Sequence, residues 1–215
     1  MTELTMVRHG ETVWHAEHRY AGSSDIPLNA HGRQQAQQLA RWAADVELDA
    51  MWASPLMRAR DTADAVAHTT GLTVHTDERL TELDFGAAEG LTSTEMTERF
   101  GAAREAFVRD PVTDHLPGGE DPRHAVERMM ACLTELSRQY PAGRVLVVGH
   151  GTIHRLVLCH LLGLPLRDYR RRFPTIRNCR VTTVRWDGTD DPDSAALLEY
   201  NVPTGSVGDP AAGIA

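Results

Sequence analysis

The sequence predicts an α/β fold of three layers, α/β/α, with a mostly parallel central sheet and a small helical cap insertion. Strand-like apolar segments alternate with segments of helical periodicity along the chain, which favours a parallel sheet. One of these segments, Arg144–Gly149, holds four consecutive apolar residues, as expected of a strand buried on both faces. We expect one domain over residues 1–201, followed by a flexible tail over 202–215 whose composition cannot form a core.

The first elements follow from apolar spacing. Leu4–Val7 is a short apolar run and is the first expected strand. Alanine and leucine residues then recur at helical spacing over about 30–45, which indicates an amphipathic helix. Leu48–Ala53 is the next expected strand.

Capping and breaking residues define the middle of the chain. Ser54 followed by Pro55 predicts an N-cap and a first helical residue, and this helix should run to about Thr70 and stop at Gly71. A short strand is expected near 73–76. The polar stretch over about 92–110 is expected to be helical and to lie as a cap above the sheet.

The last elements use the same signals. Asp121-Pro122 repeats the cap-and-proline pattern and opens a helix that ends before Pro141. The remaining elements are the strand Arg144–Gly149, a helix from Thr152 to Gly163, and a terminal strand pair, Arg180–Trp186 and Ala196–Tyr200.

All 22 basic side chains are arginine, and no lysine occurs among the 215 residues. This excludes a Schiff-base lysine, a pyridoxal-phosphate anchor and a nucleotide-binding P-loop, all of which need a lysine amine. The net charge of −8 argues against nucleic acids and anionic membranes as partners. An anionic ligand must therefore be bound by a local group of arginines.

Three widely spaced cysteines, Cys132, Cys159 and Cys179, fit a reducing compartment better than a disulfide scaffold. The N-terminus lacks the apolar stretch of a signal peptide. We therefore expect a cytoplasmic protein. A homodimer stays open, because nothing in the sequence defines the oligomeric state.

Two expected strands end in the same unusual way, in Arg8-His9-Gly10 and in Gly149-His150-Gly151. Because parallel strands present their carboxyl ends at one edge of a sheet, the two histidines could face each other there. Arg58 falls in the first turn of a helix, where the helix dipole favours an anion. Guanidinium groups match phosphate oxygens in paired hydrogen bonds, so these residues indicate a phosphate pocket.

Five segments in order then resemble the histidine phosphatase superfamily, in its phosphoglycerate-mutase-like branch. The resemblance covers Arg8 to about Val184. Its motifs are Arg8–Thr12, Ser54–Ala59 with Thr62, Leu83–Gly86 with Glu89-Gly90, Pro117–Glu120 and Gly149–Gly151. The acid-phosphatase and phytase branch resembles a different pattern, with an aspartate directly after the second histidine, and no His-Asp dipeptide occurs here.

The resemblance implies a role for each matching residue. His9 would be the nucleophile that forms a phosphohistidine, and Glu82 would donate a proton to the leaving alcohol. The phosphoryl oxygens would be held by Arg8, Arg58, His150 and Gly151. A nucleophilic histidine must be neutral, and arginine charges beside an imidazole favour the neutral form over the protonated one.

Two positions beside this set are less defined. The family commonly has asparagine after the tryptophan of the first motif, but here Trp14 is followed by His15, which could add a titratable contact to the phosphate. Arg19 matches the family's next positions and could reach a second anionic group, although a surface arginine explains it equally well.

Three functions therefore stay open. The first is a metal-independent phosphatase without a cofactor, which hydrolyses a small phosphorylated metabolite, a phosphomonoester, through a phosphohistidine. The second is a phosphoglycerate-type mutase that returns the phosphoryl group to substrate; mutases of this family resemble longer chains. The third is a non-catalytic module that binds phosphate esters.

Three other patterns are read as structural. Cys132 and Arg138 have the spacing of cysteine-based phosphatases, but no glycine lies between them and the segment is expected to be helical. His150 and His154 are spaced like a metal pair, yet a helix start at Gly151 makes His150 a poor ligand. Arg170–Arg172 is expected to be a solvated basic face.

Overall fold

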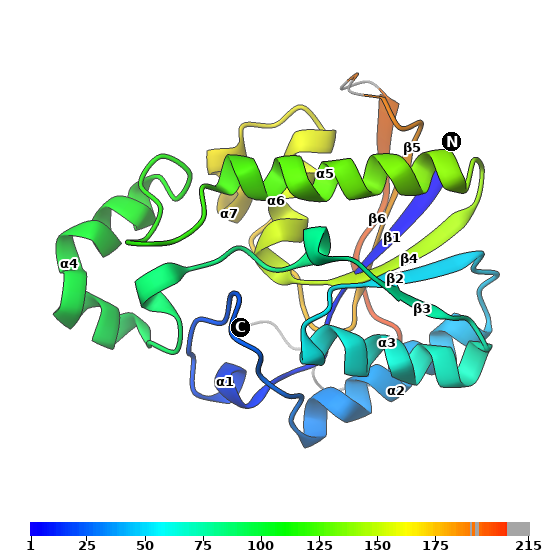
Figure 1. The fold of residues 1–215 in the computed structure, drawn as a ribbon, viewed down its shortest axis with the longest axis horizontal. Helices are drawn as coiled ribbons and strands as arrows, with labels where there is room; N and C mark the ends of the chain where they lie inside the picture. The colour runs from blue at the N-terminus through cyan, green and yellow to red at the C-terminus, as the bar shows by residue number, and fades with distance from the viewer. Residues whose placement is uncertain (190, 192–193, 206–215) are drawn as a thin grey trace.

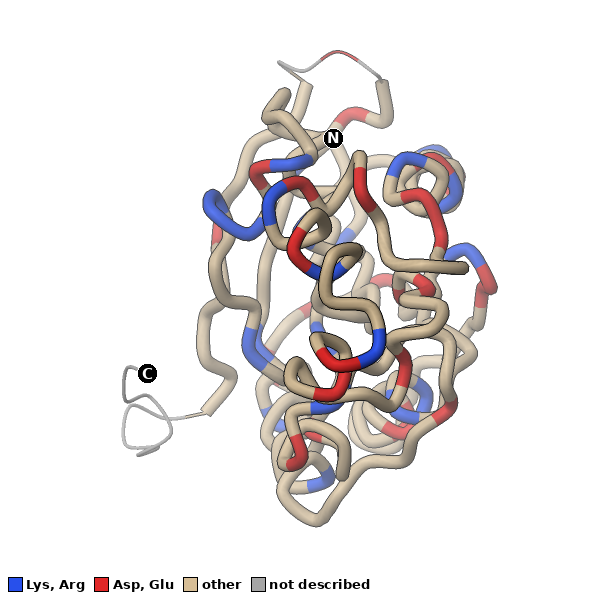
Figure 2. The backbone as a smooth tube through the Cα atoms, turned by 90° about the vertical axis from the view of Figure 1, so that its left-hand side faces the viewer, with Lys and Arg blue, Asp and Glu red and all other residues tan. Residues whose placement is uncertain are grey.

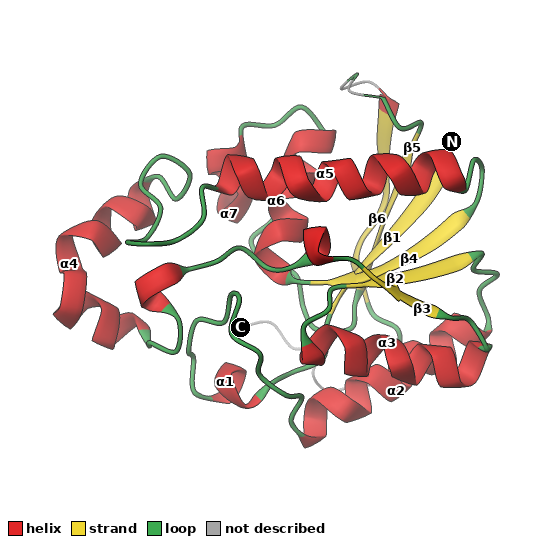
Figure 3. Cartoon of the chain, viewed as in Figure 1, coloured by secondary structure: helices red, strands yellow, loops and turns green. Residues whose placement is uncertain are grey.

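A six-stranded sheet forms the centre of the protein in the computed structural model, which describes residues 1–189, 191 and 194–205. The strand order is β3-β2-β4-β1-β5-β6 (Figure 3). Strands β3, β2, β4 and β1 are mutually parallel, and β5 is antiparallel to both of its neighbours, β1 and β6. The strands are β1 (Thr2–Arg8), β2 (Ala50–Ala53), β3 (Val74–Thr76), β4 (Arg144–Gly149), β5 (Val181–Trp186) and β6 (Ala195–Val202). The predicted mostly parallel sheet is confirmed.

Helices cover both faces of this sheet, as predicted for a three-layer fold (Figure 1). The α-helices are α1 (Val13–Ala16), α2 (Ala30–Ala44), α3 (Met57–Thr70), α4 (Ser93–Arg109), α5 (Pro122–Gln139), α6 (Gly151–Leu161) and α7 (Tyr169–Arg172). Three short 3-10 helices, η1 (Glu78–Leu80), η2 (Gly86–Ala88) and η3 (Leu166–Asp168), lie in the connections. Among the described residues, no helix is long and apolar enough to cross a membrane.

The alternation of side chains along β4 explains why its apolar run is continuous. Leu146 and Val148 pack with α2 and α3 on one face of the sheet, whereas Val145 and Val147 pack with α5 and α6 on the other. All four are fully buried. Burying a valine or leucine side chain contributes about 1.5–3 kcal/mol to the stability of the fold. Strand β4 therefore stabilises the core on both faces of the sheet.

The prediction that Ser54 caps α3 and that Pro55 opens it is wrong. Ser54 is still paired with the sheet, because its N–H donates to the carbonyl oxygen of Val148 at 3.0 Å. The N-cap is Leu56, which has extended backbone angles, and the first helical N–H, that of Met57, donates to Oδ1 of Asp25 at 2.7 Å. A distant aspartate therefore satisfies the helix terminus that Ser54 was expected to cap.

Asp121 behaves as its sequence predicts. Its side chain accepts a hydrogen bond from the N–H of Arg123 at 2.8 Å, and Pro122 is the first residue of α5.

The cap and the terminal strands also agree with expectation. Helix α4 lies beyond the carboxyl ends of β1 and β4, with a break in helical geometry at Phe100 (φ −150°, ψ 51°) (Figure 1). Strands β5 and β6 form the predicted antiparallel pair. The predicted tail begins at residue 202, but β6 includes Val202, and residues 206–215 lie outside the described part of the chain.

Candidate active site

The two His-Gly segments meet at one edge of the sheet. Strands β1 and β4 are parallel neighbours, and their last residues, Arg8 and Gly149, are register partners. The histidines that follow these residues therefore come together, and the ring centroids of His9 and His150 are 5.2 Å apart at a tilt of 62°. The sequence prediction that two strand ends bring two histidines into one site is confirmed.

The imidazole of His9 is buried and its tautomer is fixed by hydrogen bonds. Nδ1 lies 2.6 Å from the carbonyl oxygen of Gly10, so Nδ1 carries the proton and donates it there. Nε2 keeps its lone pair and accepts a hydrogen bond from Nε of Arg58 at 3.2 Å. Burial and the charges of Arg58 and Arg8 hold the pKa of His9 well below its usual range. A neutral ring with an unprotonated Nε2 is what a nucleophilic histidine needs.

Arg58 stands in the first turn of α3, as predicted, and is fully buried. Nη1 donates to the carbonyl oxygen of Ser24 and Nη2 to that of Gly22, each at 2.7 Å. Burial lowers the pKa of Arg58. Because all three guanidinium nitrogens have a partner, Arg58 both orients His9 and ties the loop at residues 22–24 to the site.

Arg8 reaches across the site from the end of β1. Nη1 donates to the carbonyl oxygen of Ile176 at 2.9 Å and Nη2 to Nε2 of His15 at 2.5 Å. Its Nε is buried and has no hydrogen-bond partner among the described residues. Burial lowers the pKa of Arg8 to about 10, which leaves the guanidinium charged at neutral pH.

His15 lies against the site at the position where the family commonly has asparagine. Nε2 of His15 lies 2.5 Å from Nη2 of Arg8, and Nδ1 accepts a hydrogen bond from the N–H of Thr12 at 3.2 Å and lies 2.8 Å from Oγ1 of the same residue. Burial and the charges of Arg8 and Arg58 lower the pKa of His15 to about 3. His15 is thus placed as a neutral partner of Arg8.

Glu82 is buried against the start of α6. One carboxylate oxygen accepts a hydrogen bond from the N–H of Thr152 at 2.9 Å, and the other accepts from Ile153 and Leu83 at the same distance. A carboxylate at a helix N-terminus is favoured by the helix dipole. Glu82, for which the family resemblance implies the role of the acid, therefore contacts the N-terminus of α6, which begins directly after His150.

His150 is the N-cap residue of α6 and is almost completely buried. Neither ring nitrogen has a hydrogen-bond partner among the described residues. Gly151 follows it, and a Cβ at this position would lie 3.1 Å from Nε of Arg8. Buried polar atoms without partners are rare, and the one N–H of this neutral ring, beside a buried arginine, is available to an anion.

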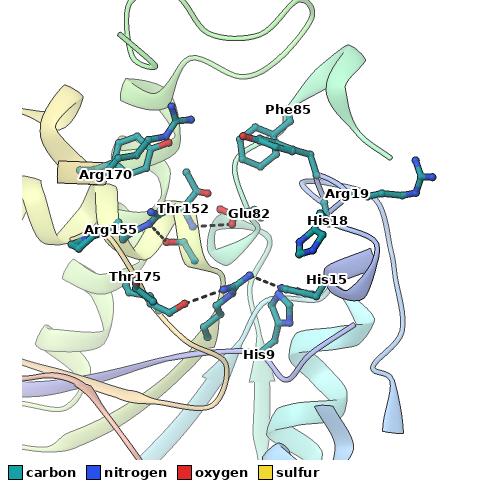
Figure 4. Close-up of a pocket in the computed structure, with 17 residues that line it drawn as sticks. His9, His15, His18, Arg19, Glu82, Phe85, Thr152, Arg155, Arg170 and Thr175 are labelled. Atoms are coloured by element: carbon teal, nitrogen blue, oxygen red, sulfur yellow. Dashed lines mark hydrogen bonds between the residues drawn. The ribbon is translucent and has the colours of Figure 1, made fainter. Parts of the chain in front are cut away.

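A cavity of about 360 Å³ opens above His9 (Figure 4). Among the described residues it is lined by Arg8, His9, His15, His18, Arg19, Tyr20, Ala21, Glu82, Phe85, Gly151, Thr152, Arg155, Tyr169, Arg170, Pro174, Thr175 and Ile176. Arg58 and His150 are absent from this lining and lie behind it. His15 and His18 stand on one side of the cavity and Arg155 and Arg170 on the opposite side.

The structure corrects one prediction and resolves another. Arg170 lines the cavity, so Arg170–Arg172 is not simply a solvated face; Arg171 and Arg172 are its exposed part and lie near Asp168. Arg19 touches the cavity, but it forms ion pairs with Glu17 and Glu95 and points away from His9 in Figure 4.

Sequence reasoning missed Arg155, Tyr169 and the lining function of Arg170. The one local signal for these cavity residues is the aromatic Tyr169 directly before the basic run. The rotation of a four-residue helix is set by tertiary packing, and a sequence pattern does not define it.

Two further sequence patterns lie in helices. Cys132 and Arg138 both lie within α5, whose backbone amides are committed to the helix, and burial raises the pKa of Cys132 to about 12. His154 lies buried inside α6. Over the described part of the chain, no group of three or more His, Cys, Asp or Glu side chains is arranged to hold a metal ion.

A close approach of two glycines supports the His9 loop. A Cβ on Gly10 would lie 2.5 Å from the carbonyl oxygen of Gly32, and a Cβ on Gly32 would lie 2.0 Å from that of Glu11. The first turn of α2 therefore packs directly on the backbone after His9. Only residues without side chains permit this distance.

The fold and site together define an α/β enzyme that handles phosphoryl groups with histidine and arginine. The model of the histidine phosphatase superfamily (branch 1) matches residues 4–197. The chain belongs to the histidine phosphatase superfamily, in its phosphoglycerate-mutase-like branch, which confirms the resemblance seen in the sequence.

Curated relatives include probable phosphoglycerate mutases GpmB from Klebsiella pneumoniae and Escherichia coli. Each is 37% identical over 185 residues, which is 86% of this chain and 85% of the relative.

Solved structures with the same fold include Bacillus stearothermophilus YhfR, with a TM-score of 0.86 and 28% identity, covering 94% of this chain and 98% of that one. A mycobacterial glucosyl-3-phosphoglycerate phosphatase matches with a TM-score of 0.84 and 28% identity, covering 93% and 98% of the two chains. A putative α-ribazole-5′-P phosphatase from Escherichia coli has a TM-score of 0.83 and 25% identity, covering 96% and 98%. The proteins that resemble this chain are therefore named both as phosphatases and as mutases.

Proposed function

We propose that the protein is a metal-independent phosphatase that hydrolyses a small phosphomonoester through a phosphohistidine on His9. The observation that carries this proposal is the tautomer of His9, whose Nε2 lone pair accepts from Nε of Arg58 while Nδ1–H is held by Gly10. The nucleophilic nitrogen thus lies beside a fixed positive charge, where a phosphoryl group would be bound. Phosphoryl transfer needs mainly such positioning and charge stabilisation.

In the first step, the lone pair on Nε2 of His9 forms the bond to phosphorus as the bond to the leaving alcohol oxygen breaks. Arg8 and the one protonated ring nitrogen of His150 would donate to the phosphoryl oxygens, and the guanidinium of Arg58 adds its charge. Glu82, in its protonated form, gives its proton to the leaving oxygen. The products are the free alcohol, a phosphohistidine and a Glu82 carboxylate.

In the second step, the oxygen of a water molecule attacks the phosphorus of the phosphohistidine. The Glu82 carboxylate takes one water proton, and the phosphorus–nitrogen bond breaks with its electron pair returning to Nε2. Inorganic phosphate leaves, and His9 and Glu82 are restored. One carboxyl group therefore acts as the acid in one half of the cycle and as the base in the other.

A phosphoglycerate-type mutase is the second candidate, and the 37% identity to probable phosphoglycerate mutases favours it. Its chemistry has the same first step, but a substrate hydroxyl replaces water in the second. The solved structures named as phosphatases, which match over nearly the whole of both chains, favour water as the acceptor.

The experiment is a quench-and-trap assay with a phosphorus-labelled monoester, run with and without a chelator. We expect label on His9 that survives alkali, release of inorganic phosphate, no transfer to added glycerate, and no effect of the chelator. His9→Asn should lose both the label and the turnover, whereas His68→Asn, on the outer part of α3, serves as control. Label on another residue, or loss of activity with the chelator, contradicts the mechanism, and transfer to glycerate indicates a mutase.

A further inference from the structure

Two arginines on one wall of the cavity have no counter-charge. Arg155 comes from α6 and Arg170 from α7, and both stand opposite His15 and His18 in Figure 4. Neither forms an ion pair with a carboxylate anywhere in the described part of the chain. This contrasts with Arg19 on the other side, which has two such pairs.

Both guanidinium groups contact the ring of Tyr169. The Cζ atoms of Arg155 and Arg170 lie 4.9 and 5.3 Å from the centroid of its ring. Arg170 also lies over the ring of Phe107, at 4.3 Å. Cation–π contacts of this kind orient a guanidinium without neutralising it. The wall therefore presents two like charges on a buried aromatic support.

The contacts of Arg155 connect this wall to the reaction centre. Its Nε donates to the carbonyl oxygen of Gly151 at 3.0 Å, which fixes the base of the guanidinium next to His150. Its other two nitrogens form no hydrogen bond with the described residues, and Arg155 lines the cavity. Arg170 is held by a long contact from Nη1 to the carbonyl oxygen of Phe107, at 3.4 Å.

The charges around the cavity do not balance among its described residues. Of the four lining arginines, Arg19 is paired and Arg8 faces the expected phosphoryl group. Glu82 is the one carboxylate in the lining, and both its oxygens already accept backbone N–H groups. The charges of Arg155 and Arg170 thus remain for a ligand.

The distribution of charge elsewhere makes this pair stand out. The chain carries a net charge of −8, and basic and acidic residues are interspersed along the backbone on the side that bears α4 (Figure 2). Two unpaired cations inside a cavity are unfavourable unless an anion enters, since half-buried charges are only partly screened.

We propose that Arg155 and Arg170 form a second anion-binding subsite, which holds a carboxylate or a second phosphate on the leaving-group part of the substrate. The inference rests on the proposed function in one respect: the phosphoryl group is taken to bind at His9. It narrows the substrate to phosphomonoesters that carry another negative group beyond the ester oxygen. Arg155 and Arg170 are then specificity-determining residues that do not touch the transferred phosphoryl group.

The test uses phosphonates, which occupy a phosphate site but are not hydrolysed. Three series with two to six methylene groups end in a carboxylate, in a second phosphonate, or in a neutral hydroxymethyl group. Dissociation constants are measured by calorimetry for the wild type and for Arg155→Met, Arg170→Met and Arg171→Met. Methionine keeps an apolar stem on the aromatic rings. Arg171 is the matched control, because it is exposed on the same helix and outside the cavity lining.

At its best chain length, the wild type should bind one anionic series at least about tenfold more tightly than the neutral one, the order expected of a charge-assisted hydrogen bond. Arg155→Met and Arg170→Met should reduce this preference at least threefold and leave the neutral series unchanged, and Arg171→Met should keep it. The series preferred, carboxylate or phosphonate, identifies the group.

Equal binding of charged and neutral series at every length overturns the inference, as does an equal loss in Arg171→Met or an absence of binding by every phosphonate. Because no turnover is measured, this result is independent of the proposed function. That function fails separately, if the wild type releases no phosphate from any monoester.

Discussion

Nε of Arg58 donates a hydrogen bond to Nε2 of His9 at 3.2 Å, and this contact fixes which nitrogen of the histidine carries the lone pair. The same guanidinium bonds two carbonyl oxygens of the neighbouring loop, those of Gly22 and Ser24. One buried side chain thus links His9 to the loop beside it.

Arg58→Lys should lower kcat/KM for a phosphomonoester by about 100-fold or more, a magnitude typical for the loss of a preorganised charge contact. A lysine ammonium cannot hold the two carbonyl oxygens and His9 in the planar geometry of a guanidinium. Steady-state kinetics check this, with Arg60→Lys, an exposed neighbour on α3, as control. Retention of half the wild-type activity in Arg58→Lys would contradict a role for the planar group.

Glu82→Gln should slow single-turnover release of an alkyl alcohol by about 100-fold or more, as expected when a general acid is lost. Release of p-nitrophenolate should change far less, since this leaving group needs no proton, and phosphoenzyme should then accumulate. A glutamine amide cannot accept all three backbone hydrogen bonds, so the variant could lose folded protein. Such a loss would slow both esters equally and therefore cancels when the two are compared in one variant. Equal slowing of both esters is the outcome that excludes Glu82 as the acid. Glu120→Gln, whose carboxylate pairs with Arg128, is the control.

Gly32→Ala should destabilise the protein by at least about 2 kcal/mol, because its Cβ would overlap the backbone of Glu11 and force the His9 loop from α2. Urea unfolding measures the change. Gly101→Ala is the matched control, since its nearest neighbour atom is 4.0 Å away, and it should stay within about 1 kcal/mol of the wild type. Comparable stability of the two variants would show that the close approach is not required.

Stability should fall as the pH drops below about 6.5, the pKa of an unfolded histidine. In the folded protein, burial and the charge of Arg8 lower the pKa of His154 to about 3. Between these values the unfolded chain binds the proton and the folded chain does not, so acidification favours unfolding. For one such group the slope reaches about 1.4 kcal/mol per pH unit.

His154→Leu removes this contribution and should flatten the decline between pH 6.5 and 4. Unfolding free energies from urea titrations at several pH values check it, with the exposed His160→Leu on the same helix as control. An unchanged pH slope in His154→Leu would mean that its burial does not govern acid sensitivity.

The reaction centre could be predicted from the sequence because its residues follow secondary-structure elements directly. His9 and His150 each follow a strand, and the rule that parallel strands end at one edge is enough to bring them together. Glu82 could be assigned only from the resemblance, since it lies in a connection whose path depends on its bonds to α6.

The opposite wall of the cavity could not be predicted, for a physical reason. Arg170 lies in a helix of four residues, and its orientation is set by Phe107, which stands 63 positions earlier in the chain. Ser54 illustrates the same limit: its sequence fits an N-cap, yet pairing with Val148 keeps it extended. Local patterns fail where a partner from a distant segment decides the conformation.

The pairing of β1 with β4 has a consequence for how the chain folds. Residues 141 positions apart, such as Glu3 and Arg144, must meet before the edge that carries His9 and His150 exists. Closing so long a loop precedes the gain from its contacts, and chains dominated by distant contacts fold slowly. Until β4 is added, the folding chain therefore leaves His9 and the apolar side chains of β1 exposed to solvent. Recovery of phosphohistidine formation during refolding would consequently report a late event, the insertion of β4 between β1 and β2.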